Sequence, residues 1–108
     1  MIRELAPAEL CRWRADPART APLVVDVREP WELERCALSD SVHLPMHELP
    51  ARLGELPRGR DVVVVCHHGV RSRFAAQYLA GAGLGPVWNL TGGVAAWSDD
   101  VDPSLPRY

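Results

Sequence analysis

Four consecutive valines, Val62 to Val65, run directly into Cys66 in the second half of the chain. A valine run without polar alternation is typical of a strand buried on both faces, and such strands occur in parallel sheets that helices cover. The chain then passes through a glycine and continues as SRFAAQYLAGAG (72–83), which predicts a helix whose glycines mark its end. A buried strand, a short turn and a helix in this order place the chain in the α/β class.

The rest of the chain repeats this alternation of short apolar runs and helical segments. Strands are expected near residues 2–5, 23–27, 41–45 and 87–90, in addition to 61–66. Helices are expected near residues 7–14, 30–36, 47–56 and 92–97, in addition to 72–83. No internal repeat, low-complexity segment or linker divides the sequence, so residues 1–108 are expected to form a single domain that ends in an extended tail.

The composition argues against several classes of function. The 12 basic residues are all arginines and are interleaved with 14 acidic ones, which disfavours a nucleic-acid-binding patch. No stretch approaches the roughly 18 apolar residues of a membrane span, and the charged N-terminus lacks the apolar core of a signal peptide. We therefore expect a cytoplasmic protein that binds neither membrane nor nucleic acid. Three cysteines at irregular spacing predict free thiols rather than a disulfide framework or a zinc site.

Cys66 is the strongest candidate for a reactive residue. It is the last residue of the predicted strand 61–66, and ligands of parallel α/β sheets bind at the carboxyl ends of the strands. In the turn that follows, Gly69 is able to adopt a positive φ, while Arg71 and Ser72 begin the next helix. Successive backbone N–H groups at a helix N-terminus form an anion-binding site, which would stabilise a thiolate over a thiol. The sequence therefore predicts a nucleophile inside an anion-binding loop.

The other cysteines and the two adjacent histidines have simpler interpretations than catalysis. Free cysteine is often simply a small buried residue, and we favour that interpretation for Cys11 and Cys36. His67 and His68 make a poor metal site, because adjacent side chains are expected to point apart and no second ligand pair stands at a suitable spacing. We expect these histidines to line the mouth of the pocket.

Four segments together resemble the single-domain rhodanese family of thiosulfate sulfurtransferases. They are LVVDVREPWEL (23–33), SVHLPMHELPARL (41–53), VVVVCHHGVRS (62–72) and NLTGGVAAW (89–97), and the second and third are specific. The resemblance implies a five-stranded parallel sheet flanked by helices on both faces. It also implies a catalytic cysteine and a substrate-binding loop, with supporting residues beside them. The catalytic residue is Cys66, the loop residues are His67, His68, Gly69, Val70 and Arg71, and the supporting residues are Asp26, Arg28 and Ser72.

The resemblance further implies a double-displacement reaction. Sulfane sulfur passes from thiosulfate to a Cys66 persulfide, and then to a thiol, to cyanide or to a protein acceptor, with no metal or cofactor. The CHHGVR loop is bulkier and more cationic than the CGSGVT-type loop of mercaptopyruvate-specific relatives, which favours an inorganic anion, while a low-molecular-weight persulfide stays open as donor. A monomer is the default expectation.

One segment departs from the family pattern. Where the family carries a GHIPGA-like turn, this chain has CALSDS (36–41), so Ala37 replaces the customary histidine and Asp40 the customary second glycine. The departure concerns local geometry and partner contacts more than the reaction.

Two other functions remain open. Cysteine-dependent phosphatases and arsenate reductases also close a loop from cysteine to arginine, but their loop has one residue more than the four that separate Cys66 from Arg71. A non-catalytic rhodanese-like binding module is the third alternative, although such modules often lose the cysteine that this chain keeps.

Overall fold

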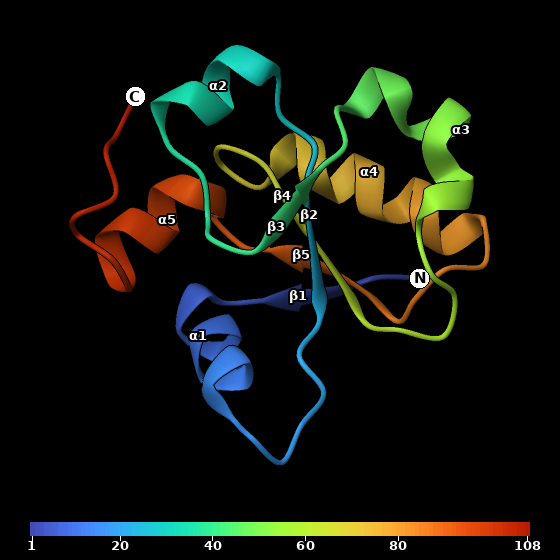
Figure 1. The fold of residues 1–108 in the computed structure, drawn as a ribbon, viewed down its shortest axis with the longest axis horizontal. Helices are drawn as coiled ribbons and strands as arrows, with labels where there is room; N and C mark the ends of the chain where they lie inside the picture. Colours follow the sequence, from blue (N-terminus) through green and yellow to red (C-terminus); the bar gives the residue numbers. More distant parts are fainter.

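The computed structural model describes residues 1–108 and has one five-stranded parallel sheet at its centre (Figure 1). The strand order is β1-β5-β4-β2-β3, and every neighbouring pair is parallel. The strands are β1 (Arg3–Leu5), β2 (Leu23–Asp26), β3 (Ser41–His43), β4 (Val62–Val65) and β5 (Val87–Leu90). The predicted α/β class and the five-stranded parallel sheet are therefore confirmed.

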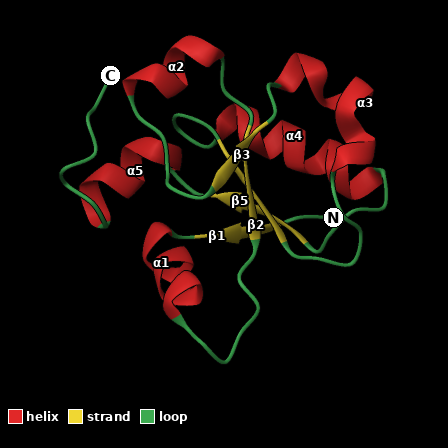
Figure 2. Cartoon of the chain, viewed as in Figure 1, coloured by secondary structure: helices red, strands yellow, loops and turns green.

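Helices cover both faces of this sheet, as predicted (Figures 1 and 2). Helices α1 and α5 pack on one face, whereas α3 and α4 pack on the other. The helices are α1 (Pro7–Ala15), α2 (Pro30–Arg35), α3 (Leu49–Arg52), α4 (Val70–Gly81) and α5 (Gly93–Asp100), and two 3₁₀ turns, η1 (Met46–Glu48) and η2 (Leu53–Glu55), flank α3. None of the helices is long and apolar enough to cross a bilayer.

The central strand β4 shows why the valine run is needed. Val62 and Val64 belong to the core under α3 and α4, whereas Val63 and Val65 belong to the core under α1 and α5. All four side chains are fully buried. Each fully buried valine side chain contributes about 1.5–3 kcal/mol to the free energy of folding. The strand therefore packs firmly in both cores, and it determines where the chain leaves the sheet at Cys66.

Several boundaries differ from the sequence predictions, and three of them belong to the elements beside Cys66. Strand β4 ends at Val65, so Cys66 is the first residue beyond the strand rather than its last. Helix α4 begins at Val70, because Gly69 already adopts a left-handed conformation (φ 93°) and caps the helix there. Helix α5 continues to Asp100, beyond the predicted end at residue 97.

One expectation of burial is also corrected. Cys36 is buried, as expected, but Cys11 is exposed. Leu10 and Trp13 occupy the buried face of α1, and this places Cys11 on the outer face. At the departure from the family pattern, Asp40 has a positive φ of 55°, a conformation that glycine adopts freely and that aspartate tolerates better than most residues. The turn therefore keeps a shape that a glycine would allow.

Candidate active site

Cys66 lies at the base of the loop that joins β4 to α4, and only 1% of the residue is exposed. Its Sγ accepts a hydrogen bond from the backbone N–H of Gly69, at 3.0 Å. Gly69 immediately precedes Val70, the first residue of α4, so the positive end of the helix dipole lies beside the sulfur. The loop therefore places one backbone donor against Sγ, beside the start of the helix.

The first turn of α5 holds the same loop from the other side. Val94 and Ala95 donate their backbone N–H groups to the carbonyl oxygens of Cys66 and His67, at 2.9 and 3.0 Å. The close approach requires Gly93, because a Cβ at this position would lie 2.3 Å from the Cys66 carbonyl oxygen. Gly93 therefore allows a direct contact between α5 and the backbone of the candidate nucleophile.

Arg71 forms a two-point ion pair with Glu32 of α2. Its Nη1 and Nη2 atoms each donate to one carboxylate oxygen of Glu32, both at 2.7 Å. The Glu32 side chain is only 4% exposed, and its Oε2 also accepts the backbone N–H of Glu29 at 2.9 Å. Hydrogen bonding to Arg71 is the main reason that the pKa of Glu32 falls to about 2. Glu32 therefore orients Arg71 and offsets part of its positive charge.

Asp26 and Arg28 form a second, fully buried ion pair at the carboxyl end of β2. The Arg28 guanidinium donates to both oxygens of Asp26, and its Nη2 also donates to the carbonyl oxygen of Cys36, at 2.8 Å. Asp26 is aligned with Val65 of β4, the residue before Cys66. The ion pair thus lies beside the base of the loop.

Ser72 and Asn89 connect the loop to the sheet. The Ser72 hydroxyl donates to Oδ1 of Asn89, and Nδ2 of Asn89 donates to the carbonyl oxygen of Gly69 at 3.1 Å. Both side chains are buried, so the contact is shielded from water. Ser72 therefore supports the loop through Asn89, a residue of β5 that no sequence pattern singled out.

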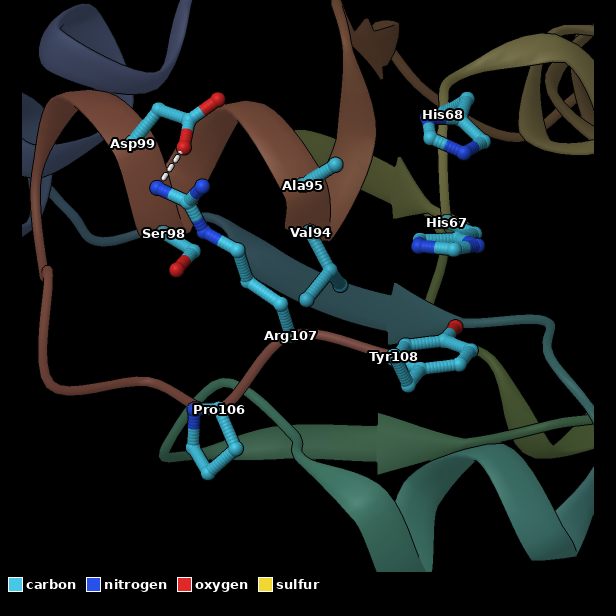
Figure 3. A pocket seen from close by; sticks show the side chains of 9 residues that line it. All are labelled: His67, His68, Val94, Ala95, Ser98, Asp99, Pro106, Arg107 and Tyr108. Carbon is cyan, nitrogen blue, oxygen red and sulfur yellow. Dashed lines mark ion pairs between the residues drawn. The ribbon is translucent and has the colours of Figure 1, made fainter.

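His67 and His68 do not point apart, which corrects the sequence expectation. Their rings stack, with centroids 3.9 Å apart. His67 is also stacked on the ring of Tyr108, at 3.9 Å and with an interplanar angle of 12° (Figure 3). Partial burial, with a smaller contribution from His68, lowers the pKa of His67. The ring of His67 is therefore mostly neutral at pH 7 and contributes less positive potential than a protonated histidine.

The two histidines line a cavity of about 220 Å³, as expected for the mouth of a pocket. Helix α5 supplies one wall and the C-terminal segment the other (Figure 3). The lining residues are His67, His68, Val94, Ala95, Ser98, Asp99, Pro106, Arg107 and Tyr108. Cys66 is absent from this set. The cavity therefore lies beside the loop of residues 66–71, called the thiol loop below, and not over the sulfur itself.

The structure brings nearly all the predicted site residues to one end of the sheet. Val70 is the least integrated, because its side chain is exposed on the outer surface of α4. Two residues of the site were not predicted from the sequence: Glu32, which pairs with Arg71, and Tyr108, which stacks on His67. Nowhere do three or more metal-ligating side chains come together.

The Glu32 contact predicts a specific pH dependence of stability. Glu32 has a pKa of about 2 in the folded chain, against an ordinary value of 4.5. Its stabilising contribution is therefore complete above pH 4.5 and is lost as the pH falls toward 2. We expect Glu32→Gln to be less stable than the wild type at pH 6 by about 2–3 kcal/mol, with the difference shrinking toward pH 2.

Urea unfolding across this pH range measures the effect. Glu55→Gln is the matched control, because Glu55 pairs with Arg52 on the surface and should produce little change. A stability difference for Glu32→Gln that stays constant from pH 6 to pH 2 would contradict this account.

Known proteins resemble this chain in both sequence and structure. The sequence profile of the Rhodanese-like domain matches residues 7–100. A sulfurtransferase of Allochromatium vinosum is 41% identical, over 91% of this chain and 90% of its own length. Thiosulfate sulfurtransferase GlpE of Pseudomonas syringae pv. syringae is 40% identical, over 69% of this chain and 71% of its own length. The crystal structure of a rhodanese-related protein from Thermoplasma volcanium superposes with a TM-score of 0.82 at 31% identity, covering 92% of this chain and 93% of that one.

Proposed function

This chain belongs to the rhodanese-like domain family, and from that premise we propose that it moves sulfane sulfur from thiosulfate to a thiophilic acceptor through a persulfide on Cys66. Relatives named as sulfurtransferases support a general role in sulfur transfer. The observation that carries the finer proposal is the hydrogen bond from Gly69 N–H to the Cys66 sulfur at the start of α4. A donor at this position stabilises the negative charge of the thiolate that attacks the sulfur donor.

The proposed reaction has two displacement steps. The Cys66 thiolate attacks the outer sulfur of thiosulfate, an S–S bond forms to Cys66, and the bond to the sulfonate sulfur breaks with release of sulfite. A nucleophile, either cyanide or a thiolate, then attacks the terminal sulfur of the persulfide and regenerates the thiolate. Thiocyanate or a new persulfide leaves. The charges balance in both steps, and neither step needs an oxidant, a metal or a cofactor.

The loop residues divide the work of binding and support. Arg71 is 41% exposed at its side chain, so it is able to attract the anionic donor while Glu32 fixes its orientation. His67 and His68 line the approach, Gly69 supplies the backbone donor, and Val70 begins the helix that follows. Asp26, Arg28 and Ser72 hold the surrounding backbone. The deep burial of Cys66 favours a donor that presents a single narrow sulfur atom, as thiosulfate does.

We also take residues 1–108 as one domain. Pairing of β1, near the start of the chain, with β5, near its end, supports this view. The sulfur donor and acceptor are the expected partners, and a thiol-bearing protein acceptor is compatible with the site.

The short loop argues for sulfur transfer over phosphate chemistry. Four residues separate Cys66 from Arg71, and both terminal nitrogens of Arg71 donate to Glu32 instead of converging on Sγ. A cysteine phosphatase needs its arginine and a wider ring of amides around a tetrahedral oxyanion.

Intact mass spectrometry under non-reducing conditions tests the proposal. After thiosulfate treatment, the reduced wild-type protein is expected to gain one sulfur atom, which cyanide then removes as thiocyanate. Cys66→Ser should gain none. Cys11→Ser and Cys36→Ser are matched controls, because they remove the other two thiols and should retain the full mass increase. The absence of any mass increase in the wild type, or an increase that survives Cys66→Ser, would contradict the proposal.

A further inference from the structure

The C-terminal segment folds back across α5 and delivers Tyr108 to the thiol loop (Figure 1). The backbone N–H groups of Val101 and Asp102 donate to the carbonyl oxygen of Trp97, both at 2.9 Å. The Ser98 hydroxyl donates to the carbonyl oxygen of Leu105 at 2.8 Å. Residues 101–108 lie beyond the match to the family profile, which ends at residue 100. The profile match therefore does not include Tyr108.

The Tyr108 hydroxyl joins the two ion pairs of the site. It accepts a hydrogen bond from Nη1 of Arg28 at 2.8 Å and donates one to Oε1 of Glu32 at 2.9 Å. Burial is the main cause that raises the pKa of Tyr108 to about 12, so the phenol stays protonated and able to donate at neutral pH. The same oxygen of Glu32 binds Arg71. The Tyr108 hydroxyl and the Arg71 guanidinium thus both donate hydrogen bonds to Oε1 of Glu32.

The Tyr108 ring contacts the opposite end of the loop. It stacks on His67 (Figure 3). The ring of Trp31 packs edge-on against Tyr108, with centroids 5.9 Å apart and an interplanar angle of 86°. A single side chain therefore touches the first loop residue directly and the last one, Arg71, through Glu32. No other side chain in the site reaches both ends of the loop in this way.

We propose that Tyr108 is a positioning residue of the active site, whose hydroxyl orients Arg71 through Glu32 and whose ring holds His67. The expected effect on the KM for thiosulfate rests on the proposed sulfur transfer, whereas the orientation of Arg71 and His67 by Tyr108 does not. Without the hydroxyl, Oε1 of Glu32 has Arg71 as its remaining partner. Arg71 is then drawn more strongly toward Glu32, and its charge is less available to an anionic donor.

Kinetics of three full-length variants test the role of the hydroxyl. Tyr108→Phe removes the hydroxyl and keeps the ring, whereas Tyr78→Phe makes the same change on the exposed face of α4 and is the matched control. For Tyr108→Phe we expect the KM for thiosulfate to rise about threefold to tenfold with kcat changed less than about twofold, because a hydrogen bond to a charged group is lost. Tyr108→Leu should raise KM at least as much. Equal KM values for Tyr108→Phe and Tyr78→Phe would overturn the proposal.

The role of the ring has a readout that does not depend on activity. The pKa of the His67 imidazole, followed by NMR, is expected to stay low in Tyr108→Phe and to rise toward 6.5 in Tyr108→Leu, because only the second variant exposes the imidazole. The charged and titratable groups that face His67 remain in both variants: His68, Glu32, Arg28 and Arg71. An unchanged His67 pKa in Tyr108→Leu would overturn the claim that the ring holds His67.

The side-chain NMR signal of Arg71 separates this inference from the proposed function. In the wild type and in Tyr78→Phe, the Nε–H resonance of Arg71 should be sharp and dispersed, as for a fixed guanidinium. In Tyr108→Phe it should shift or broaden. This result would support the positioning role even if thiosulfate transferred no sulfur to the wild type, and an unchanged resonance would refute the role even if the enzyme were active.

Discussion

Gly93→Ala is expected to abolish most of the sulfur transfer and to lower the free energy of unfolding by about 2–5 kcal/mol. A Cβ at this position would lie 2.3 Å from the carbonyl oxygen of Cys66 and 2.5 Å from that of His67. Both are backbone atoms, so no side-chain rotation relieves the overlap. Gly93 also has a φ of 60°, which adds strain for any residue with a Cβ. Either α5 or the thiol loop must shift.

The loss of activity should exceed what instability alone produces. We expect the rate of persulfide formation to fall at least tenfold in the fraction of Gly93→Ala that remains folded, because a displacement near 1 Å at the nucleophile has large kinetic consequences. Gly54→Ala is the matched control, since its Cβ would meet no atom within 4 Å. Thermal unfolding and single-turnover mass spectrometry on both variants measure the two effects. A Gly93→Ala protein with wild-type stability and rate would show that the loop tolerates movement here.

The parts of the fold that the sequence predicted depend on local signals. The valine run from Val62 to Val65 has no polar alternation, so it indicated a strand buried on both faces. Gly69 followed by a helical pattern indicated a turn and a helix start. The loop from Cys66 to Arg71 was therefore predictable as a unit, because its strand, turn and helix are contiguous in the sequence. The error in the start of α4 arose because Arg71 and Ser72 look like first-turn residues, while Gly69 in fact ends the turn.

The contacts that the sequence missed join distant segments. Glu32 is 39 residues from Arg71, and Tyr108 is 76 residues from Glu32. No period or spacing marks such pairs, since an acidic residue in a short helix usually faces water. The one available signal was the REPWEL segment, where Glu32 lies at a position of α2 that turns toward the sheet. The C-terminal segment looked extended because it has neither helical nor strand periodicity, and the turn from Asp102 to Leu105 returns it to α5.

The stacking of His67 and His68 also differs from the expectation that their side chains point apart. Consecutive residues in a strand do point apart, but His67 and His68 follow the end of β4 and belong to a tight loop. In that loop the backbone turns between the two residues and brings their rings face to face. The stack then depends on Tyr108, which no local pattern places there.

Arg28→Met is expected to lower the free energy of unfolding by about 3–5 kcal/mol, because it leaves the buried carboxylate of Asp26 without its partner. Arg28 is completely inaccessible to solvent and donates to Asp26, to the Cys36 carbonyl oxygen and to the Tyr108 hydroxyl. Methionine fills a similar volume, so the loss is electrostatic more than steric. Urea unfolding at pH 7 measures it.

A double variant identifies the origin of this loss. Asp26→Asn combined with Arg28→Met removes both charges, and it should recover at least half of the stability lost in Arg28→Met alone, because neutral groups are much less costly to bury than an unpaired charge. Arg73→Met is the surface control: Arg73 pairs with Glu4 where both side chains are nearly half exposed, and its loss should cost at most about 1 kcal/mol. If the double variant is no more stable than Arg28→Met, the contacts of Arg28 with Cys36 and Tyr108 carry the stabilisation, and the ion pair with Asp26 contributes little.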